Sequence, residues 1–487
     1  MKSAFFLILL SSVLAFAQTA PAPYGVVPTE RQLKWQETEM YFILHFTPTT
    51  FENKEWGFGD ANPKTFNPSQ FDATQIVKAA KAGGLKGMVF VAKHHDGFCL
   101  WPTKTTAYNI SKSPFRNGKG DMVKEFEQAC RKNGLKFGVY CSPWDRNNAE
   151  YGTPAYINTY RNQLRELYSN YGQLFMSWHD GANGGDGYYG GKREKRKIDN
   201  LTYYGWDSTW SITRKMQPMA SIFSDVGLDV RWVGNERGEA AETSWATFSP
   251  LSPDRKTYGS PGYCDTDESP GGTRNGKYWM PAECDVPLRR GWFYHAEQDS
   301  TVKSVEKLFQ LYLKSVGRGA CLDLGLAPDT RGILHENDVK VLKEFGQKLT
   351  RTFSKNLLAG AKIKASNVRG NNSQKFGTQF LTDKNRYSYW ATDDTQPVAS
   401  LEINLPKETR FDILQLRENI KLGQRVEGFA IDVWQNNKWN EAATGTSIGA
   451  NKIIKLSGQF VTSKVRIRIT KSPACIVLSD LGLYLEQ

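Results

Sequence analysis

The sequence predicts an α/β chain in which a (β/α)8-type barrel precedes an all-β sandwich. From about Met40 to Pro328, short apolar runs alternate with amphipathic, helix-like segments, a pattern typical of a parallel sheet covered on both faces. About eight such units favour a closed barrel over a doubly wound open sheet, and no glycine fingerprint of dinucleotide binding opens a helix. After about residue 350 polar and apolar residues alternate between turns, which predicts the sandwich.

The first element, residues 1–17, has the composition of a signal peptide. Lys2 provides a positive start, Phe5 to Leu14 form an apolar core, and Ala15-Phe-Ala17 is a small-x-small cleavage signal. This core is too short to span a membrane, and no later segment is apolar for long enough. We expect cleavage near Ala17 and a secreted or periplasmic product without a membrane span.

Residues 18–350 are expected to form the barrel domain, in which apolar runs mark the strands and amphipathic segments mark the helices. The more regular runs are Tyr41–Phe46, Gly87–Ala92, Lys136–Tyr140 and Gln173–Trp178. The less regular runs are Ala220–Ser224, Val230–Val233, Tyr278–Ala282, Gly291–Tyr294 and Gly319–Leu324. Helices are expected within Asp72–Gly83, Lys119–Asn133 and Thr153–Tyr171.

Residues 355–487 are expected to form the sandwich, with the domain boundary between Leu349 and Ser354. Alternating runs such as Gln396–Asn404, Phe429–Trp434 and Val465–Ile469 are separated by turn residues. Their spacing is typical of an antiparallel sandwich.

Charge and cysteine content exclude some functional classes. The net charge is +13, but the cations are dispersed, and we interpret the one dense run, Lys192–Lys197, as a solvated loop or helix start. We therefore expect no nucleic-acid partner. The seven cysteines show no CxxC pair and no zinc spacing, and the sequence leaves open whether Cys264 pairs with Cys284.

Histidines gather at the predicted strand ends. Five of the six are in or just after a predicted strand: His45, His94, His95, His179 and His295. Because the carboxyl ends of barrel strands build the active site, we expect one shared polar pocket there. The alternative for any single histidine is a satisfied structural residue.

Carboxylates follow the same strand ends, namely Glu55, Asp96, Asp145, Asp180, Glu236 and Glu283. Two carboxylates that face one pocket are the requirement of glycoside hydrolysis, in which one attacks the anomeric carbon and the other handles the proton. Aromatic side chains, with 14 Trp and 21 Tyr in the chain, suit sugar binding, although a large core explains them equally well. Spacing alone leaves open which pair of carboxylates works.

Five ordered motifs resemble the glycoside hydrolase family 29 α-L-fucosidases. They are Phe46–Phe51 with Glu55–Gly57, Lys93–Phe98 with Leu100–Trp101, Tyr140–Asp145, Trp178–Asn183, and Ser315–Gly319 with Leu324–Pro328. The resemblance covers most of residues 25–345. It implies a secreted enzyme that acts on fucosylated oligosaccharides or glycoconjugates without a cofactor for catalysis.

The resemblance also implies roles for single residues. Asp180, in the Trp-x-Asp-Gly motif, matches the family nucleophile, although His179 stands where the family usually has Phe. The positions that match fucose-binding residues are His45, Trp56, His94, His95 and Tyr140, together with Glu55 and Trp292. The segment Trp232–Gly238 resembles the subfamily specific for α-1,3/1,4-linked fucose, in which its glutamate, here Glu236, is the acid/base. Glu283 is the alternative acid/base.

Residues 355–487 resemble the discoidin or galactose-binding-like sandwiches appended to many glycosidases. Such sandwiches often hold a structural Ca²⁺, and the loop around Asp383 is the candidate site here. The sandwich could bind carbohydrate or brace the barrel. We favour bracing, because no row of exposed aromatic residues is evident in the sequence.

Two other functions compete with this prediction. A metal-dependent hydrolase on the same barrel could use His45, His94 and His95 as zinc ligands, but such sites commonly use His-x-His and here the pair is adjacent. A carbohydrate-binding protein with an inactive barrel would lack the nucleophile or the acid, and both are present. The sequence indicates no oligomeric state.

Overall fold

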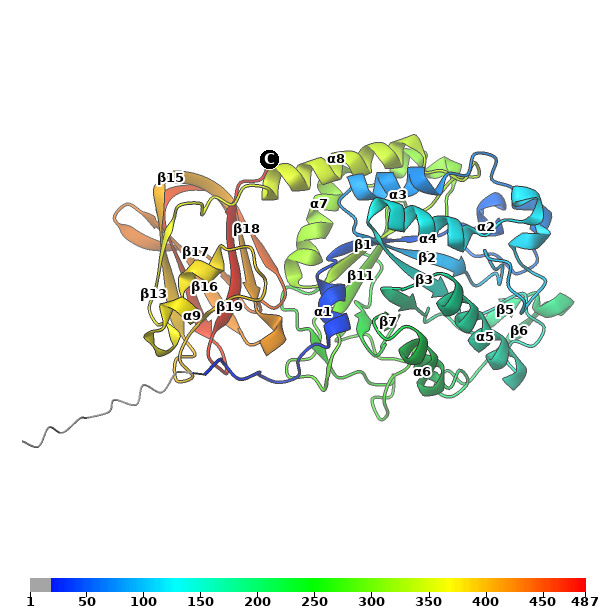
Figure 1. Cartoon of the computed structure of the whole chain (residues 1–487), viewed down its shortest axis with the longest axis horizontal. Coiled ribbons are helices and arrows are strands. Elements are labelled where there is room, and N and C mark those ends of the chain that lie inside the picture. Colours follow the sequence, from blue (N-terminus) through cyan, green and yellow to red (C-terminus); the bar gives the residue numbers. More distant parts are fainter. Residues whose placement is uncertain (1–18) are drawn as a thin grey trace, which may run out of the picture.

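The computed structural model describes residues 19–487, so the predicted signal peptide lies outside the described residues. Figure 1 shows a barrel surrounded by helices on one side of the molecule and a β-sandwich on the other. The barrel closes through eight parallel strands in the order β1-β12-β11-β8-β7-β4-β3-β2. The predicted fold class is therefore confirmed, and the doubly wound open sheet is excluded.

The barrel strands are short and almost fully buried, as the continuous apolar runs predict. Their bounds are β1 Met40–Leu44, β2 Gly87–Lys93, β3 Lys136–Cys141, β4 Met176–Trp178, β7 Ser221–Ser224, β8 Val230–Trp232, β11 Ala282–Pro287 and β12 Cys321–Leu326. Every residue of β1, β2 and β12 is buried. Such strands need cover on both faces, which the helices and the side chains inside the barrel provide.

Six helices cover the outside of the barrel: α3 Ala73–Ala82, α4 Met122–Asn133, α5 Pro154–Asn170, α6 Trp206–Met216, α7 Val305–Lys314 and α8 Glu336–Phe353. Local sequence sets their ends. The Asp72 side chain caps α3 by accepting from the backbone of Thr74 and Gln75, and Asp121 and Ser304 cap α4 and α7 in the same way. Gly134 ends α4 in the left-handed conformation.

The strict alternation of strand and helix fails in one part of the barrel. Over the described residues 225–229 and 233–281, which link β7 to β8 and β8 to β11, no helix forms. The second link contains only the short pair β9 Thr247–Phe248 and β10 Tyr278–Trp279. The predicted strand Tyr278–Ala282 is therefore wrong as a barrel strand, because β11 begins where that run ends.

The predicted strand Gly291–Tyr294 is also wrong, since Gly291–Phe293 form bends after β11 and Tyr294 is in no regular element. The backbone N–H groups of Trp292 and Phe293 donate to the Glu55 carboxylate. A side chain thus takes the donors that a neighbouring strand would otherwise use. The aromatic residues of this run reach the mouth of the barrel instead of its wall.

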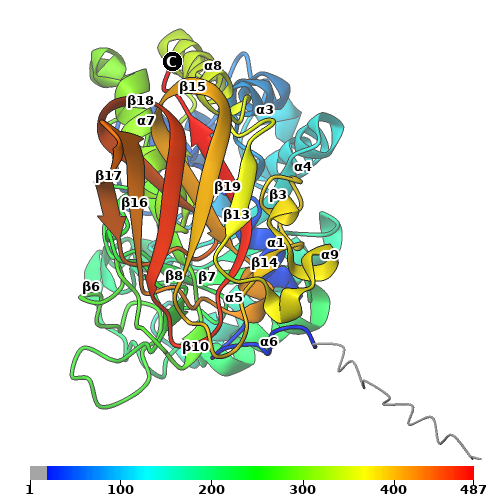
Figure 2. The same ribbon diagram turned by 90° about the vertical axis from the view of Figure 1, so that its left-hand side faces the viewer.

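Seven antiparallel strands form the sandwich: β13 Lys362–Ala365, β14 Trp390–Ala391, β15 Ala399–Glu418, β16 Gly428–Gln435, β17 Lys438–Gly445, β18 Lys452–Lys471 and β19 Val477–Tyr484. Figure 2 shows β13, β15, β18 and β19 side by side. The long strands β15 and β18 shift register between Asn404 and Thr409 and again near Phe411. Buried residues such as Trp390, Leu401 and Ile467 form a hydrophobic core of their own.

The sandwich is fixed to the barrel by buried polar contacts. Glu39, just before β1, accepts from Arg386 and Arg417 of the sandwich and pairs with Lys86 at 2.9 Å. Gln424 bonds the backbone of Ser244 and Ala246 in the loop after β8. The sandwich therefore contacts both the start of β1 and the helix-free loop after β8, which supports a bracing role.

Replacing Glu39 by Gln is expected to lower the free energy of unfolding by about 3 kcal/mol, because it leaves the buried Arg417 and the partly buried Arg386 without their carboxylate. Burial alone would raise the pKa of Glu39, but Arg417, Arg386 and Lys86 hold it well below its usual range. The stabilisation is therefore present above the ordinary glutamate pKa of 4.5 and is lost as the pH falls below it.

Urea unfolding at pH 7 and at pH 3.5 measures the effect of the Glu39 substitution and its pH dependence. The control, Glu30→Gln in an exposed pair with Lys34, should change nothing measurable; an equally stable Glu39→Gln protein would contradict the contact's role.

The cysteines, the dense basic run and the search for membrane spans test three further predictions. All seven cysteines are free, so Cys264 and Cys284 are not paired. Part of the dense basic run forms a short hairpin instead of a loop or helix start, with β6 Glu194–Arg196 against β5 Gly185–Gly187. Within residues 19–487 no helix is both long and apolar enough to cross a bilayer.

The loop around Asp383 does not form a preassembled set of calcium ligands. Its carboxylate accepts from the backbone of Asn385 at 2.8 Å and from the Ser388 hydroxyl at 2.6 Å. Among the described residues no group of three or more His, Cys, Asp or Glu side chains is placed to hold a metal ion. The structural Ca²⁺ stays a prediction of the resemblance.

Candidate active site

The sequence-predicted site residues meet at the carboxyl ends of the barrel strands. His45 follows β1, His94 and His95 follow β2, and Asp180 lies two residues after β4. Because all eight strands are parallel, these ends share one mouth of the barrel. His95 and Asp180, which come from different strands, thus lie 3.7 Å apart.

Asp180 is held in a fixed orientation and stays partly open to solvent, with 22% of its side chain exposed. Its Oδ2 accepts from the Tyr140 hydroxyl at 2.8 Å and lies 3.7 Å from His95 Nε2. Its Oδ1 accepts from the backbone of Ala182 at 2.7 Å. A carboxylate oriented by neutral donors at the pocket floor can attack an electrophilic carbon.

Gly181, behind Asp180, is required by close packing. A Cβ atom at this position would lie 1.9 Å from Asp225 Oδ2. Asp225 directly follows β7, and burial together with the nearby Asp180 raises its pKa to about 7. Asp225 was not predicted as a site residue, although it follows a strand end as the predicted carboxylates do.

The three histidines of the pocket are neutral. Burial, with the neighbouring His95, lowers the pKa of His45 to about 3, and burial lowers that of His95 to about 4 even though Asp180 opposes the shift. His95 Nδ1 bonds the Ser142 hydroxyl at 2.7 Å. Nδ1 of His45 and of His94 has no protein partner among residues 19–487. Neutral imidazoles can bond sugar hydroxyls without adding charge.

Glu55 links two loops that enclose the pocket. Its carboxylate accepts from the Trp292 backbone and from His295 Nε2 at 3.0 Å. This contact brings the Trp292 ring to 5.3 Å from the His45 ring. Trp56, which is 49% exposed, stands over His95 with ring centroids 5.1 Å apart. The two indoles therefore provide aromatic faces at the rim.

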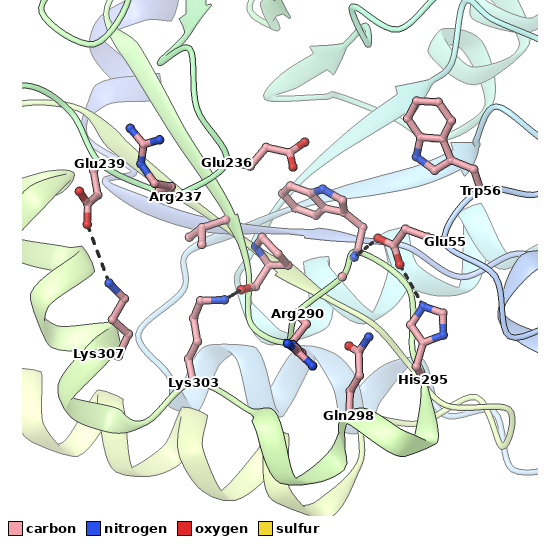
Figure 3. A pocket seen from close by; sticks show the side chains of 14 residues that line it. Glu55, Trp56, Glu236, Arg237, Glu239, Arg290, His295, Gln298, Lys303 and Lys307 are labelled. Atoms are coloured by element: carbon pink, nitrogen blue, oxygen red, sulfur yellow. Dashed lines mark hydrogen bonds and ion pairs between the residues drawn. The ribbon is translucent and has the colours of Figure 1, made fainter. Parts of the chain in front are cut away.

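Glu236 and Glu283 occupy very different places. Glu236 is exposed and lines a pocket of about 720 Å³ together with Glu55, Trp56 and Trp292 (Figure 3). Burial on its pocket side raises the pKa of Glu236, a hydrogen bond from Trp292 opposes this, and Asp180 and Glu55 raise it further. A carboxyl group that keeps its proton near the ionised carboxylate of a neighbouring residue suits a general acid.

Glu283 lies inside the barrel wall, fully buried in β11. Its carboxyl group accepts from the Tyr41 hydroxyl and from the Trp178 indole at 2.7 Å. Burial, Asp323 and Asp285 raise its pKa well above the usual value. These contacts favour a structural role for Glu283 over proton transfer to a substrate.

Three other strand-end residues point away from the pocket. His179 bonds the Tyr160 hydroxyl at 2.7 Å and Ser177 at 3.1 Å, towards helix α5. These bonds hold the His179 ring against α5, so the prediction that five histidines share the pocket is wrong for His179. Asp96 bonds Thr47 and Thr49, and Asp145 pairs with Lys93; both are structural.

Comparison with known proteins decides which chemistry this geometry serves. Residues 22–352 match the family model for alpha-L-fucosidase, and residues 362–480 match the F5/8 type C domain. The chain belongs to the alpha-L-fucosidase family, glycoside hydrolase family 29. Alpha-L-fucosidase 1 of Arabidopsis thaliana is 36% identical over 481 residues, which cover 98% of this chain and 91% of the relative.

Solved structures of the same family share the whole fold. A glycoside hydrolase 29 family member from an unknown rumen bacterium is 37% identical with a TM-score of 0.84, over 96% of this chain and 78% of that one. A Ruminococcus gnavus GH29 fucosidase, solved in complex with fucose, is 28% identical with a TM-score of 0.85, over 96% and 97% of the two chains. The chain is thus an α-L-fucosidase, a glycoside hydrolase.

Proposed function

We propose that this α-L-fucosidase is an exo-acting, retaining enzyme with Asp180 as nucleophile and Glu236 as acid/base. We further propose that it removes terminal α-1,3/1,4-linked fucose from Lewis-type branched glycans. One observation best supports this mechanism. Asp180 is held in a fixed orientation and is open to solvent, and its negative charge helps to raise the pKa of Glu236. Neutral His45, His94 and His95, with Trp56 and Trp292, would hold the fucose hydroxyls and its apolar face.

The two steps follow from these positions. Asp180 attacks the anomeric carbon, and Glu236 donates its proton to the glycosidic oxygen as the leaving glycan departs. Glu236, now a carboxylate, then takes a proton from water, which opens the fucosyl ester on Asp180 and restores both groups. Retention needs about 5–5.5 Å between the two carboxyl groups, and we expect this separation in the substrate complex.

The linkage preference is tested by comparing fucose release from Lewis-type trisaccharides with release from an α-1,2-linked fucosyl trisaccharide. We expect kcat/KM to be at least about tenfold higher for the branched glycans, because about 1.4 kcal/mol of leaving-group contact suffices for that ratio. A higher value for the α-1,2 linkage would contradict the proposed specificity and leave the fucosidase activity intact.

The pH profile should report the raised pKa of Glu236. The general acid acts only with its proton, so kcat/KM should hold below this pKa and fall about tenfold per pH unit above it. Glu236→Gln should remove this basic limb when the substrate has an activated leaving group, which needs no acid. Asp225→Asn should keep the limb; its loss in that variant would assign the limb to Asp225 instead.

The proposed location is secreted or periplasmic, after cleavage near Ala17. The mass of the N-terminal peptide of the exported protein measures the cleavage site directly.

A further inference from the structure

A basic annex adjoins the fucose-binding pocket. It consists of Arg237, Arg290, Lys303 and Lys307 with Gln298, which line the same 720 Å³ pocket as Glu55, Trp56, Glu236 and Trp292. Figure 3 shows Glu236 and Arg237 on one side of this pocket, the other annex residues on the opposite side, and Trp56 at one end. Asp180 and the three pocket histidines do not line it. The annex therefore begins where the fucose pocket ends.

The proposed role of Glu236 places the leaving glycan on the annex side of the fucose pocket. Glu236 gives its proton to the glycosidic oxygen, so the leaving glycan must lie on the Glu236 side of the fucose. The pocket extends from Glu236 towards Lys303 and Lys307 at the start of α7. Sugar residues of the leaving glycan that are remote from fucose would thus lie in the annex.

The annex has a surplus of positive charge. Among residues 19–487 no carboxylate oxygen lies within 4.0 Å of Arg237, Arg290 or Lys303. Lys307 has only a distant partner, Glu239 at 3.8 Å, which pairs more closely with Lys314 at 3.0 Å. Three carboxylates, Glu55, Glu236 and Glu239, line the same pocket as the four cations. Glu55 is engaged by His295 and the Trp292 backbone, and Glu239 by Lys314, so a positive surplus remains.

Lys303 is fixed in place without an anion. Its Nζ donates to the backbone carbonyls of Pro287 at 2.5 Å and Arg289 at 2.9 Å. Burial and the neighbouring Lys307 lower its pKa to about 8. Lys303 and Lys307 with Arg290 on one side of the pocket, and the Arg237 guanidinium on the other, match an anionic ligand.

We propose that the annex binds an anionic group, a carboxylate or a sulfate ester, on the leaving glycan, and so gives the enzyme a preference for acidic fucosylated glycans. This inference rests on the proposed function, because it places the leaving glycan by the position of Glu236. The annex acts on binding and takes no part in the proton or bond transfers.

The test compares kcat/KM for a neutral Lewis-type glycan with its sialylated and sulfated counterparts. At low ionic strength, at least one acidic glycan should be cleaved about five- to tenfold more efficiently than the neutral one, as expected for a charge-assisted contact at a partly exposed site. The preference should shrink in about 0.5 M NaCl, since salt screens exposed charges. The better of the two acidic glycans identifies the anion.

Variants show whether the annex causes the preference. The double variant Arg237→Gln/Arg290→Gln should bring the acidic-to-neutral ratio down to about one. The control Arg351→Gln, an exposed arginine near the end of α8 outside the pocket, should leave both rates and their ratio unchanged. The salt dependence of the unaltered enzyme needs no variant and stands if the double variant fails to fold.

The outcomes separate the two proposals. Equal or lower efficiency on both acidic glycans, or a preference that survives the double variant, would overturn the annex and leave the proposed function standing. No fucose release from neutral or acidic branched glycans would overturn both.

Discussion

Replacing Asp180 by Ala is expected to lower kcat/KM for fucose release by at least about 10⁴-fold, as removal of a covalent nucleophile does in other hydrolases. The loss should be specific, because the Asp180 carboxylate bonds Tyr140 and the Ala182 backbone and lies beside His95 at the barrel mouth, outside the hydrophobic core. The control Asp207→Ala, on the exposed side of α6, should keep activity.

Azide distinguishes the role of Asp180 from a general loss of activity. With an activated fucoside, azide can enter the space of the missing carboxylate and attack in a single displacement, which gives the β-fucosyl azide. Activity within about tenfold of the unaltered enzyme would show that Asp180 is not the nucleophile.

Replacing Glu236 by Ala is expected to lower kcat/KM on natural glycans by about 10²- to 10⁴-fold, the usual contribution of a general acid. The loss should be much smaller for a substrate with an activated leaving group, whose departure needs no proton. Azide should then restore turnover by attacking the fucosyl ester on Asp180. Because this is the second displacement, the product should be the α-fucosyl azide, the opposite anomer from that of the Asp180 variant.

Glu283→Gln is the matched control for Glu236. The amide can keep the bond from the Tyr41 hydroxyl or from the Trp178 indole, so most activity should remain in the folded variant. If Glu283→Gln lost activity and Glu283→Ala were rescued by azide, while Glu236→Ala stayed active, the acid/base would be Glu283.

The barrel strands were predictable because their residues are buried on both faces and so form continuous apolar runs, as in β1 and β2. The run Gly291–Tyr294 has the same apolar character, yet it forms no strand, because Glu55 captures its backbone donors from 237 residues away. No local pattern contains such a contact. The helix-free segment 233–281 escaped prediction for a similar reason: its loops are held by Arg231 and by the sandwich and not by their own periodicity.

In the site, too, local motifs predicted which residues lie at strand ends, but not how their side chains point or how their pKa values shift. Motifs placed Asp180, His94 and His95 at strand ends, and the fold brings them to one barrel mouth. Which way a strand-end side chain points depends on its phase in the strand, so His179 faces α5 while Asp180 next to it bonds Tyr140. The pKa of Glu236 is raised by burial and by the charges of Asp180 and Glu55, against a hydrogen bond with Trp292 that lowers it, and none of these three residues is adjacent to Glu236 in sequence.

The most direct test of the retaining fucosidase mechanism is the configuration of fucose at the moment of release, followed by proton NMR during hydrolysis of a Lewis-type trisaccharide. Two displacements, on Asp180 and then by water activated by Glu236, predict that α-L-fucose appears first and then equilibrates with the β anomer. First appearance of β-L-fucose would contradict the retaining mechanism, and absence of released fucose would contradict the proposed specificity for branched glycans.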